Sequence, residues 1–371
     1  MNIMTKFKIG FIFLVGLFTL NLEANPVFAR QYDMACSACH SQVPALNDMG
    51  LGFARNGFRT STFDTTSLQS LLDENSTSRR YPVGAILGLS DNSKTDEVNR
   101  LVKLYLSGTL TEYLSLYSFT KESFNSNKSG QDLFESDNSQ FYFQYNILEA
   151  KHVFRAGLLS PLTQLGNVQR SMSHSGLNGI GDHGDNYVSP LGYADVRKIK
   201  GAEYSYLFDN NILLLVSYGE QVAKHGNHGN QINDDNNDAF LTGITYTTAE
   251  NYKIGLIYNS VDTEGDDFYS IIVPIEKEYS MLTWNSSLVY ANIADDDYIG
   301  LETAFTFPLG DMEHIKAIVN VDNDENDNTN YGYSLGYTKI YKMFFFEAAA
   351  GRVNTEKYSS NKATGSINLI F

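Results

Sequence analysis

The chain has 371 residues and a formal net charge of −16, and its lysines and arginines gather into nothing larger than the pairs Arg79-Arg80 and Arg197-Lys198. Nucleic-acid binding is therefore excluded, because it needs a basic patch or stripe. The sequence has two cysteines, both in one short motif, so no disulfide framework ties distant segments together. With 24 Tyr and 23 Phe but a mean hydropathy of −0.26, the apolar residues are dispersed, which favours strands over membrane helices.

The first 29 residues have the pattern of an export signal. Lys6 and Lys8 precede the apolar run 9–22, and the small-residue pattern Val27-Phe28-Ala29 follows. The run is shorter than the roughly 18 apolar residues of a membrane-spanning helix, although a retained anchoring helix is the competing interpretation. We predict a signal peptide over residues 1–29, with Leu22-Glu23-Ala24 as a second candidate cleavage site.

A C-x-x-C-H motif follows at Cys36-Ser37-Ala38-Cys39-His40. Two thiols on one turn form thioethers with the haem vinyl groups, and the adjacent imidazole ligates the iron. The competing interpretations are a redox dithiol, half of a zinc site and chance, but zinc would need other ligand types and a dithiol does not need the histidine. The motif predicts one covalent haem c, attached at Cys36 and Cys39 and ligated by His40.

The second axial ligand is less determined. Met49 is the local candidate, while a histidine from elsewhere and an open position are the alternatives. Residues 30–80 form a haem module too short to bury a core alone, so a neighbouring structure must help hold it. We expect a helix to begin after 44–47, a turn at 55–58 and a short helix over 68–74.

Residues 81–371 repeat segments of about ten residues with alternating polarity, the pattern of a transmembrane β-barrel. Within 140–147, Phe141, Phe143, Tyr145 and Ile147 alternate with polar residues and with Tyr142, and 102–109 alternates similarly. A soluble sandwich or propeller is the alternative. Pro274 weakens the tenth segment and the third has no clear polar face. We predict an all-β, antiparallel barrel of about 16 strands, which begin near 81, 98, 113, 139, 151, 199, 211, 238, 251, 267, 279, 297, 313, 331, 343 and 362.

The connections differ in length by parity. Those after even-numbered strands are predicted to be very short, and those after odd-numbered strands are generally longer, as in outer-membrane barrels, where short turns face the periplasm. Both ends of the barrel then lie on the periplasmic side. The short turns are placed at Thr111-Glu112, Glu149-Ala150, Asp209-Asn210, Ala249-Glu250, Lys277-Glu278, Gly310-Asp311 and Tyr341-Lys342.

Two long connections carry further histidines. The connection 161–198 contains His174, His183 and Asp185, and its length predicts a loop that folds inward or caps the barrel. A second loop carries a candidate metal site, for which the competing interpretation is a solvated polar loop that binds nothing. Its residues are His225, His228, Asp234, Asp235 and Asp238.

The module followed by a barrel resembles the fused monohaem cytochrome-porins of bacterial outer membranes, whose known representatives oxidise iron. The resemblance rests on Ala29-Arg30-Gln31-Tyr32, Cys36-Ser37-Ala38-Cys39-His40, Pro44-Ala45-Leu46-Asn47, Gly50 and Asn56-Gly57. It implies a haem module that plugs the barrel lumen, and electrons that pass between an extracellular donor and a periplasmic carrier. Only haem attachment to Cys36 and Cys39 and ligation by His40 are carried over by residue.

The sequence thus predicts an electron-transfer protein of the outer membrane, in contact with its lipid, with an extracellular donor or acceptor, ferrous iron being a candidate, and with a periplasmic electron carrier. Whether it counts as an enzyme is left open. Two alternatives are a passive porin gated or stabilised by the haem module, and an outer-membrane haem peroxidase with an open axial position. No catalytic triad or phosphate-binding glycine loop stands out.

Overall fold

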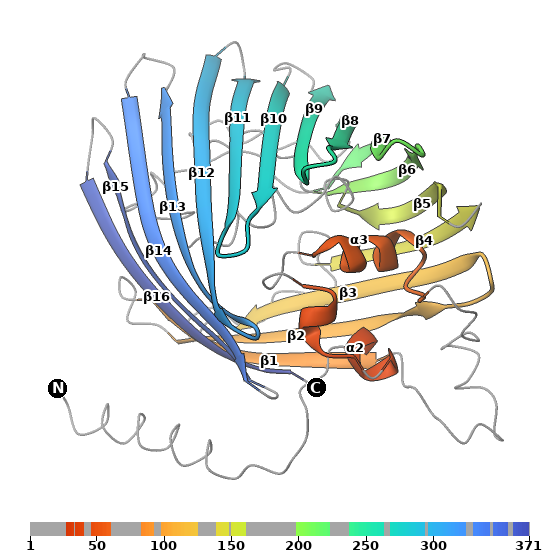
Figure 1. Cartoon of the computed structure of the whole chain (residues 1–371), viewed down its shortest axis with the longest axis horizontal. Coiled ribbons are helices and arrows are strands. Elements are labelled where there is room, and N and C mark those ends of the chain that lie inside the picture. The colour runs from red at the N-terminus through yellow and green to blue at the C-terminus, as the bar shows by residue number, and fades with distance from the viewer. Residues whose placement is uncertain are drawn as a thin grey trace, which may run out of the picture.

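Sixteen antiparallel strands close into one barrel in the computed structural model (Figure 1), which describes residues 27–32, 34–40, 46–60, 83–92, 98–124, 139–147, 150–160, 198–222, 237–262, 268–293, 296–323, 329–341, 344–354 and 359–370. Each strand pairs with its neighbours in sequence, and β1 pairs with β16 to close the sheet. The predicted fold class and strand number are confirmed. The strands are β1 Val83–Asn92, β2 Val98–Thr109, β3 Leu114–Phe124, β4 Ser139–Ile147, β5 His152–Leu159, β6 Ile199–Leu207, β7 Ile212–Gln221, β8 Asp238–Thr247, β9 Tyr252–Asp262, β10 Phe268–Glu278, β11 Thr283–Ile293, β12 Asp296–Gly310, β13 Glu313–Asn323, β14 Thr329–Tyr341, β15 Phe344–Asn354 and β16 Ser359–Ile370.

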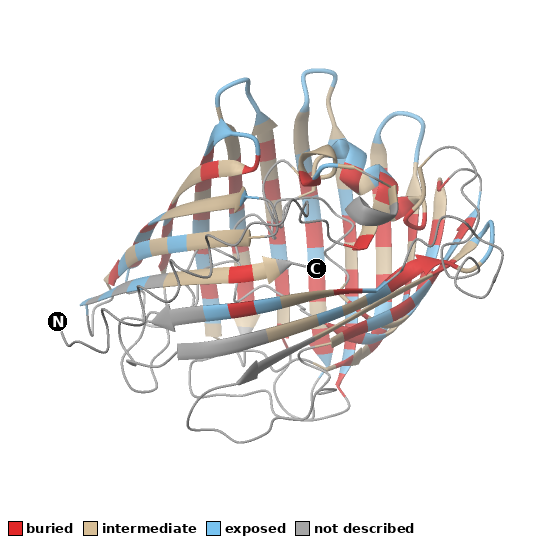
Figure 2. Cartoon of the chain, turned by 90° about the horizontal axis from the view of Figure 1, so that it is seen from below, coloured by how far each residue is buried: buried red, intermediate tan, exposed pale blue. Residues whose placement is uncertain are grey.

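Burial alternates along the strands with the period of two that a barrel wall requires (Figure 2). In β4, Gln140, Tyr142, Gln144 and Asn146 are buried and face the lumen, while the residues between them are exposed on the outer face. The same alternation places Lys103, Tyr105, Ser107 and Thr109 of β2 inward. Both predicted alternations are confirmed.

The short connections lie at one end of the barrel, as predicted, and several depend on a left-handed backbone. Non-glycine residues with positive φ occur at Ala150, Asn211, Asn251 and Met312, each in a connection that follows an even-numbered strand. The turn placed at Lys277-Glu278 was wrong, because those two residues pair with Trp284 and Thr283 and extend β10. At Gly310 and Tyr341 the strand likewise continues into the predicted turn.

Pro274 lies inside β10, and Gly255 on the neighbouring strand β9 leaves room for its ring. The pairing of β10 with β11 continues through Pro274, which stands opposite Ser287, but the pairing with β9 is interrupted at Val273 and Pro274. Proline has no N–H to donate, so a ladder is expected to weaken there. The facing residue is Gly255, where an added Cβ would lie 3.0 Å from the Pro274 ring.

The missing polar face of β3 has a structural cause. Its lumen-facing residues include Tyr117 and Phe119, and the Tyr117 ring stacks on Phe58 at a centroid distance of 5.4 Å. Phe58 belongs to the N-terminal segment 27–60, so this part of the lumen wall faces protein. An aromatic residue is therefore favoured where a water-filled lumen would favour a polar one.

Three short elements precede the barrel and lie on the inner side of its strands (Figure 1): α2 Val27–Tyr32, the 3₁₀ turn η1 Cys36–Ala38, and α3 Asp48–Arg55. The predicted helix entry and turn are confirmed, since Asn47 caps α3 and the chain turns at Asn56–Phe58. The short helix predicted over 68–74 lies outside the described residues. No helix within the described ranges is long and apolar enough to cross a membrane.

The end of α3 follows the Schellman pattern. The Phe58 N–H donates to the Phe53 carbonyl at 2.9 Å and the Gly57 N–H to the Ala54 carbonyl at 3.3 Å. Gly57 and Phe58 both have positive φ, 68° and 62°. That conformation is costly for phenylalanine, and the packing of its ring on Phe28 and Tyr117 offsets the cost.

Candidate haem-attachment site

The C-x-x-C-H motif folds as one tight turn, called here the attachment turn, Cys36–His40. The N–H groups of Cys39 and His40 donate to the Cys36 carbonyl at 3.2 and 3.0 Å. Both thiols and the imidazole therefore project from a single turn, and Cys36 and Cys39 form no disulfide. This arrangement fits the two thioether bonds and one axial ligand of haem c.

The attachment turn is only partly covered by protein. Cys36 is buried, while Cys39 and His40 are half-buried. Burial raises the pKa of both thiols, and the carboxylate of Asp311 adds to the increase in the pKa of Cys36. Because Asp311 lies in the turn between β12 and β13, the attachment turn lies at the short-turn end of the barrel.

Helix α3 holds the attachment turn from the other side. The Asn47 side chain accepts from the Gly50 N–H at 2.9 Å, and its amide donates to the carbonyls of Ser37 and Ala38 at 3.3 and 3.1 Å. His40 and Leu46 form an isolated antiparallel β-bridge. The turn and the helix are therefore one hydrogen-bonded unit.

Arg55, the last residue of α3, fastens this unit to the lumen wall. Its guanidinium donates to Ser205 Oγ of β6 at 3.0 Å and to the carbonyls of Ala150 and Lys151, in the turn after β4, at 3.0 and 3.4 Å. The Arg55 carbonyl accepts in turn from the side chains of Gln144 and Asn146. Burial lowers the pKa of Arg55 to about 10.

A buried ion pair on the wall neighbours this contact. Arg155 of β5 donates through Nε to Glu203 Oε1 of β6 at 2.6 Å, and Ser217 donates to the other carboxylate oxygen at 3.1 Å. The Arg155 guanidinium also lies 5.0 Å from the centre of the Tyr142 ring. Glu203 favours the charged form of Arg55, whereas Arg155 opposes it.

The first turn of α3 has its own contact with the barrel. Lys253 Nζ of β9 lies 2.8 Å from Asp48 Oδ1 and 3.2 Å from Glu276 Oε1 of β10. Asp48 is largely exposed, whereas Glu276 is buried. The two ends of α3 thus contact different parts of the wall, β9 and β10 at one end and β4 to β6 at the other.

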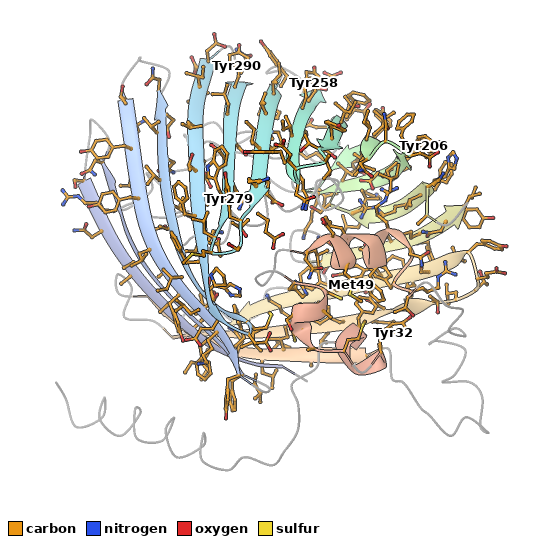
Figure 3. The ribbon with its side chains drawn as sticks, viewed as in Figure 1. Tyr32, Met49, Tyr206, Tyr258, Tyr279 and Tyr290 are labelled. Atoms are coloured by element: carbon orange, nitrogen blue, oxygen red, sulfur yellow. The ribbon has the colours of Figure 1, made fainter. Side chains whose placement is uncertain are left out.

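An aromatic cluster joins α2 and α3 to the wall. The ring of Phe28 stacks on Phe58 at 4.7 Å, Phe58 on Tyr117 at 5.4 Å, and Tyr117 on Tyr142 at 5.2 Å. The Tyr32 hydroxyl donates to the Phe58 carbonyl at 2.7 Å. Figure 3 shows Tyr32 and the α3 residue Met49 on the inner side of the strands.

The structure gathers three of the four predicted site residues, Cys36, Cys39 and His40, on one turn. Met49 lies on α3 with 47% of its surface exposed, and its role as second axial ligand stays a prediction. Sequence reasoning missed Arg55, Lys253 and Tyr117. A signal was present for Tyr117, because it stands at a lumen-facing position of β3 where a polar residue is expected.

The candidate ligands predicted on the two long loops fall almost wholly outside the described ranges. His174, His183, Asp185, His225, His228, Asp234 and Asp235 lie outside the described residues, as does nearly all of the connection 161–198. Asp238 is described, and its carboxylate accepts from the Tyr218 hydroxyl at 2.7 Å. Within the described part of the chain, no three His, Cys, Asp or Glu side chains gather as a metal site would need.

The fold defines a class, the porin-like β-barrels. An anion-selective porin from Comamonas acidovorans is 12% identical with a TM-score of 0.53, and the match covers 78% of this chain and 98% of that one. OmpT of Vibrio cholerae, in a form with loop L8 deleted, is 11% identical with a TM-score of 0.51 and the same coverage. At this identity the likeness shows the fold alone. No family model matches the sequence, and the comparison with curated proteins finds no match.

Proposed function

We propose that this chain is an outer-membrane electron-transfer protein in which one haem c, attached at Cys36 and Cys39 and ligated by His40, is held by the N-terminal segment in the short-turn end of the lumen. The observation that carries the proposal is the set of hydrogen bonds from Arg55, at the end of α3, to Ser205 and the turn after β4. These bonds connect the helix that contacts the attachment turn to lumen-facing residues.

The outer face of the barrel supports a place in a lipid bilayer. Its exposed residues are predominantly large and apolar, among them Phe141, Phe143, Leu256 and Leu301. In the bacterial outer membrane, barrels of this type place their short turns in the periplasm. The attachment turn, near Asp311, then faces the periplasmic side.

When bound, haem c supplies an iron that takes up and releases one electron. The chain would hold it with two thioether bonds and one imidazole and keep it at the periplasmic mouth. The partners are an extracellular donor or acceptor, with ferrous iron as the candidate substrate, and a periplasmic electron carrier. Covalent attachment suits this role because the group cannot be lost through an open barrel end.

The likeness to porins favours a second candidate, a passive pore stabilised by the haem module. A porin lumen is normally polar. Here nine lumen-facing apolar or small residues on β7 to β15 form a buried cluster with exposures of 0–7%. Buried polar residues such as Asn259, Glu302 and Asn320 share that wall, so the composition of the lumen fits either candidate, and electron transfer is preferred because of the C-x-x-C-H turn. The nine are Leu213, Leu215, Leu241, Ile257, Ile272, Val289, Ala304, Ile318 and Val353.

The test is an absorption spectrum of the purified protein, produced with the haem-attachment machinery, after oxidation in air and after addition of ferrous iron. We expect covalent haem that becomes reduced. The variant His40→Ala should lose this spectrum. The matched control is His152→Ala, which removes a histidine of β5 whose ring contacts Tyr204 and Tyr206.

Planar-bilayer conductance of the same preparations separates the candidates. A haem-loaded protein with negligible ion conductance supports the conduit. A barrel that carries no haem and conducts ions overturns the proposal and leaves a porin. Turnover that depends on peroxide instead would point to a peroxidase with an open axial position.

A further inference from the structure

We propose that Asn47 and Gly50 form a clamp that fixes the attachment turn to α3 and thereby sets the orientation of His40 relative to the barrel. The role is one of positioning, since neither residue is a haem ligand. The inference depends on the proposed function only in assuming that His40 ligates a haem. The clamp is a property of the chain and can be measured without it.

Asn47 serves two purposes at once. As the N-cap of α3, its side-chain oxygen accepts from the Gly50 N–H, which any good capping residue can do. Its amide also donates to the carbonyls of Ser37 and Ala38, the two residues between the cysteines. The second task requires an N–H donor, which aspartate and serine capping groups do not place there.

The backbone of Asn47 adds a third bond, because its N–H donates to the Cys39 carbonyl at 3.0 Å. The side-chain and backbone bonds of this one residue therefore reach three consecutive carbonyls, those of residues 37, 38 and 39. A turn held at three successive peptide units has little freedom to rotate, and His40 is the next residue along the chain.

Gly50 allows the helix to come this close. A Cβ added at Gly50 would overlap the Cys39 carbonyl and lie 3.0 Å from the Leu46 side chain. The backbone of Gly50 is ordinary helix, so the glycine is explained by this contact and by no unusual φ angle. Gly52, two residues further along α3, has nothing within 4 Å of an added Cβ.

The barrel completes the clamp. Because Arg55 and Asp48 fasten the two ends of α3 to the lumen wall, any residue that fixes the turn to α3 also fixes it to the wall. The eight-residue helix α3 thereby connects the attachment turn, and with it the His40 ring, to the barrel wall. A haem at the mouth of a barrel meets its partners in a reproducible geometry only if such a connection exists.

The experiment compares the full-length variants Asn47→Asp, Gly50→Ala and Gly52→Ala with the parent protein. Asn47→Asp keeps the cap and removes the amide donor, and Gly50→Ala introduces the overlap. Gly52→Ala is the matched control, as it adds the same methyl group to the same helix in open space. Hydrogen exchange of the attachment turn and the electron paramagnetic resonance of the ferric haem are measured for each.

We expect exchange in the attachment turn to accelerate about tenfold in Asn47→Asp and Gly50→Ala, the size of effect that losing a hydrogen bond produces. Their ferric spectra should broaden, because the His40 ring is no longer held in one orientation, while Gly52→Ala matches the parent. Parent-like exchange and spectra in Asn47→Asp and Gly50→Ala would overturn the clamp, and so would an equal change in all three variants. If the parent carries no haem, the proposed function fails, but exchange still decides the clamp.

Discussion

Asp48 and Glu276 share one ammonium group, that of Lys253, although the two carboxylates are in very different surroundings. The Asp48 side chain keeps 79% of its surface exposed, whereas Lys253 keeps 19% and Glu276 only 5%. The same lysine therefore makes a solvent-exposed ion pair with the helix and a buried one with the wall. These two pairs differ in what their loss costs.

We predict that Lys253→Met destabilises the protein far more than Asp48→Asn. Loss of the exposed pair costs below about 1 kcal/mol and is reduced by salt, whereas removing Lys253 leaves Glu276 buried without its counter-ion, at a cost of about 3–5 kcal/mol. Urea unfolding in detergent micelles measures both. Equal losses for the two variants would show that Glu276 is hydrated.

A second prediction concerns Arg155 and Glu203, which retain 2% and 1% of their side-chain surface. Glu203→Gln leaves the Arg155 charge buried and also removes the carboxylate that favours the Arg55 guanidinium, so we expect a loss of about 3–5 kcal/mol and a looser N-terminal segment. The double variant Arg155→Met, Glu203→Met removes both charges and should be milder. Urea unfolding and limited proteolysis of the N-terminal segment check both effects. A double variant worse than Glu203→Gln would contradict this account.

The packing of Phe28 bears on where the signal peptide is removed. Cleavage after Ala29 would discard Val27, which is 4% exposed, and Phe28, whose ring contacts Phe53 and Phe58. Cleavage after Ala24 keeps both. We therefore predict that the mature protein begins at Asn25, which intact mass spectrometry can determine. A measured mass that corresponds to a chain beginning at Arg30 would show that the aromatic cluster forms without Phe28.

The barrel was largely predictable because its signals are local. Alternating polarity repeats every two residues, as in 140–147, and the turn residues Asn211 and Asn251 tolerate the left-handed backbone that their positions require. Strand ends were less certain, and β10 runs past the expected turn at Lys277. Nothing local distinguishes a charged residue that ends a strand from one that continues it.

The site was predictable only as far as the C-x-x-C-H motif. The contact between Arg55 and Ser205 joins residues 150 positions apart, and no local pattern announces it. The sequence around Tyr117 showed that β3 has no polar face, but it did not predict which residue would cover that face. The physical reason became clear once Phe58 was found against it: a wall position covered by protein follows the rules of a core.

A fourth prediction addresses backbone geometry in the wall beneath the module. Gly157 of β5 has φ of 136°, and an added Cβ would overlap the Phe141 carbonyl and approach the Tyr142 backbone to 2.8 Å. Gly157→Ala should therefore cost about 1–3 kcal/mol and weaken the pairing of β4 with β5. Gly336→Ala, where the nearest atoms lie 3.8 Å away, is the control and should unfold like the parent in the same urea titration. Equal midpoints would show that β4 and β5 adjust without strain.

The last prediction tests whether the aromatic cluster holds the N-terminal segment. Tyr117 is stacked between Phe58 and Tyr142, whereas Leu116, its neighbour in β3, faces outward opposite Phe143. Tyr117→Ala should raise the protease sensitivity of residues 27–60 severalfold, because it removes a ring worth roughly 3–5 kcal/mol when buried, and Tyr117→Phe should not, since stacking is kept. Leu116→Ala shortens an outward side chain in the same strand and should leave the segment protected. If all three variants stay protected, Arg55 and Lys253 suffice to hold the segment, and the aromatic wall of β3 serves the barrel alone.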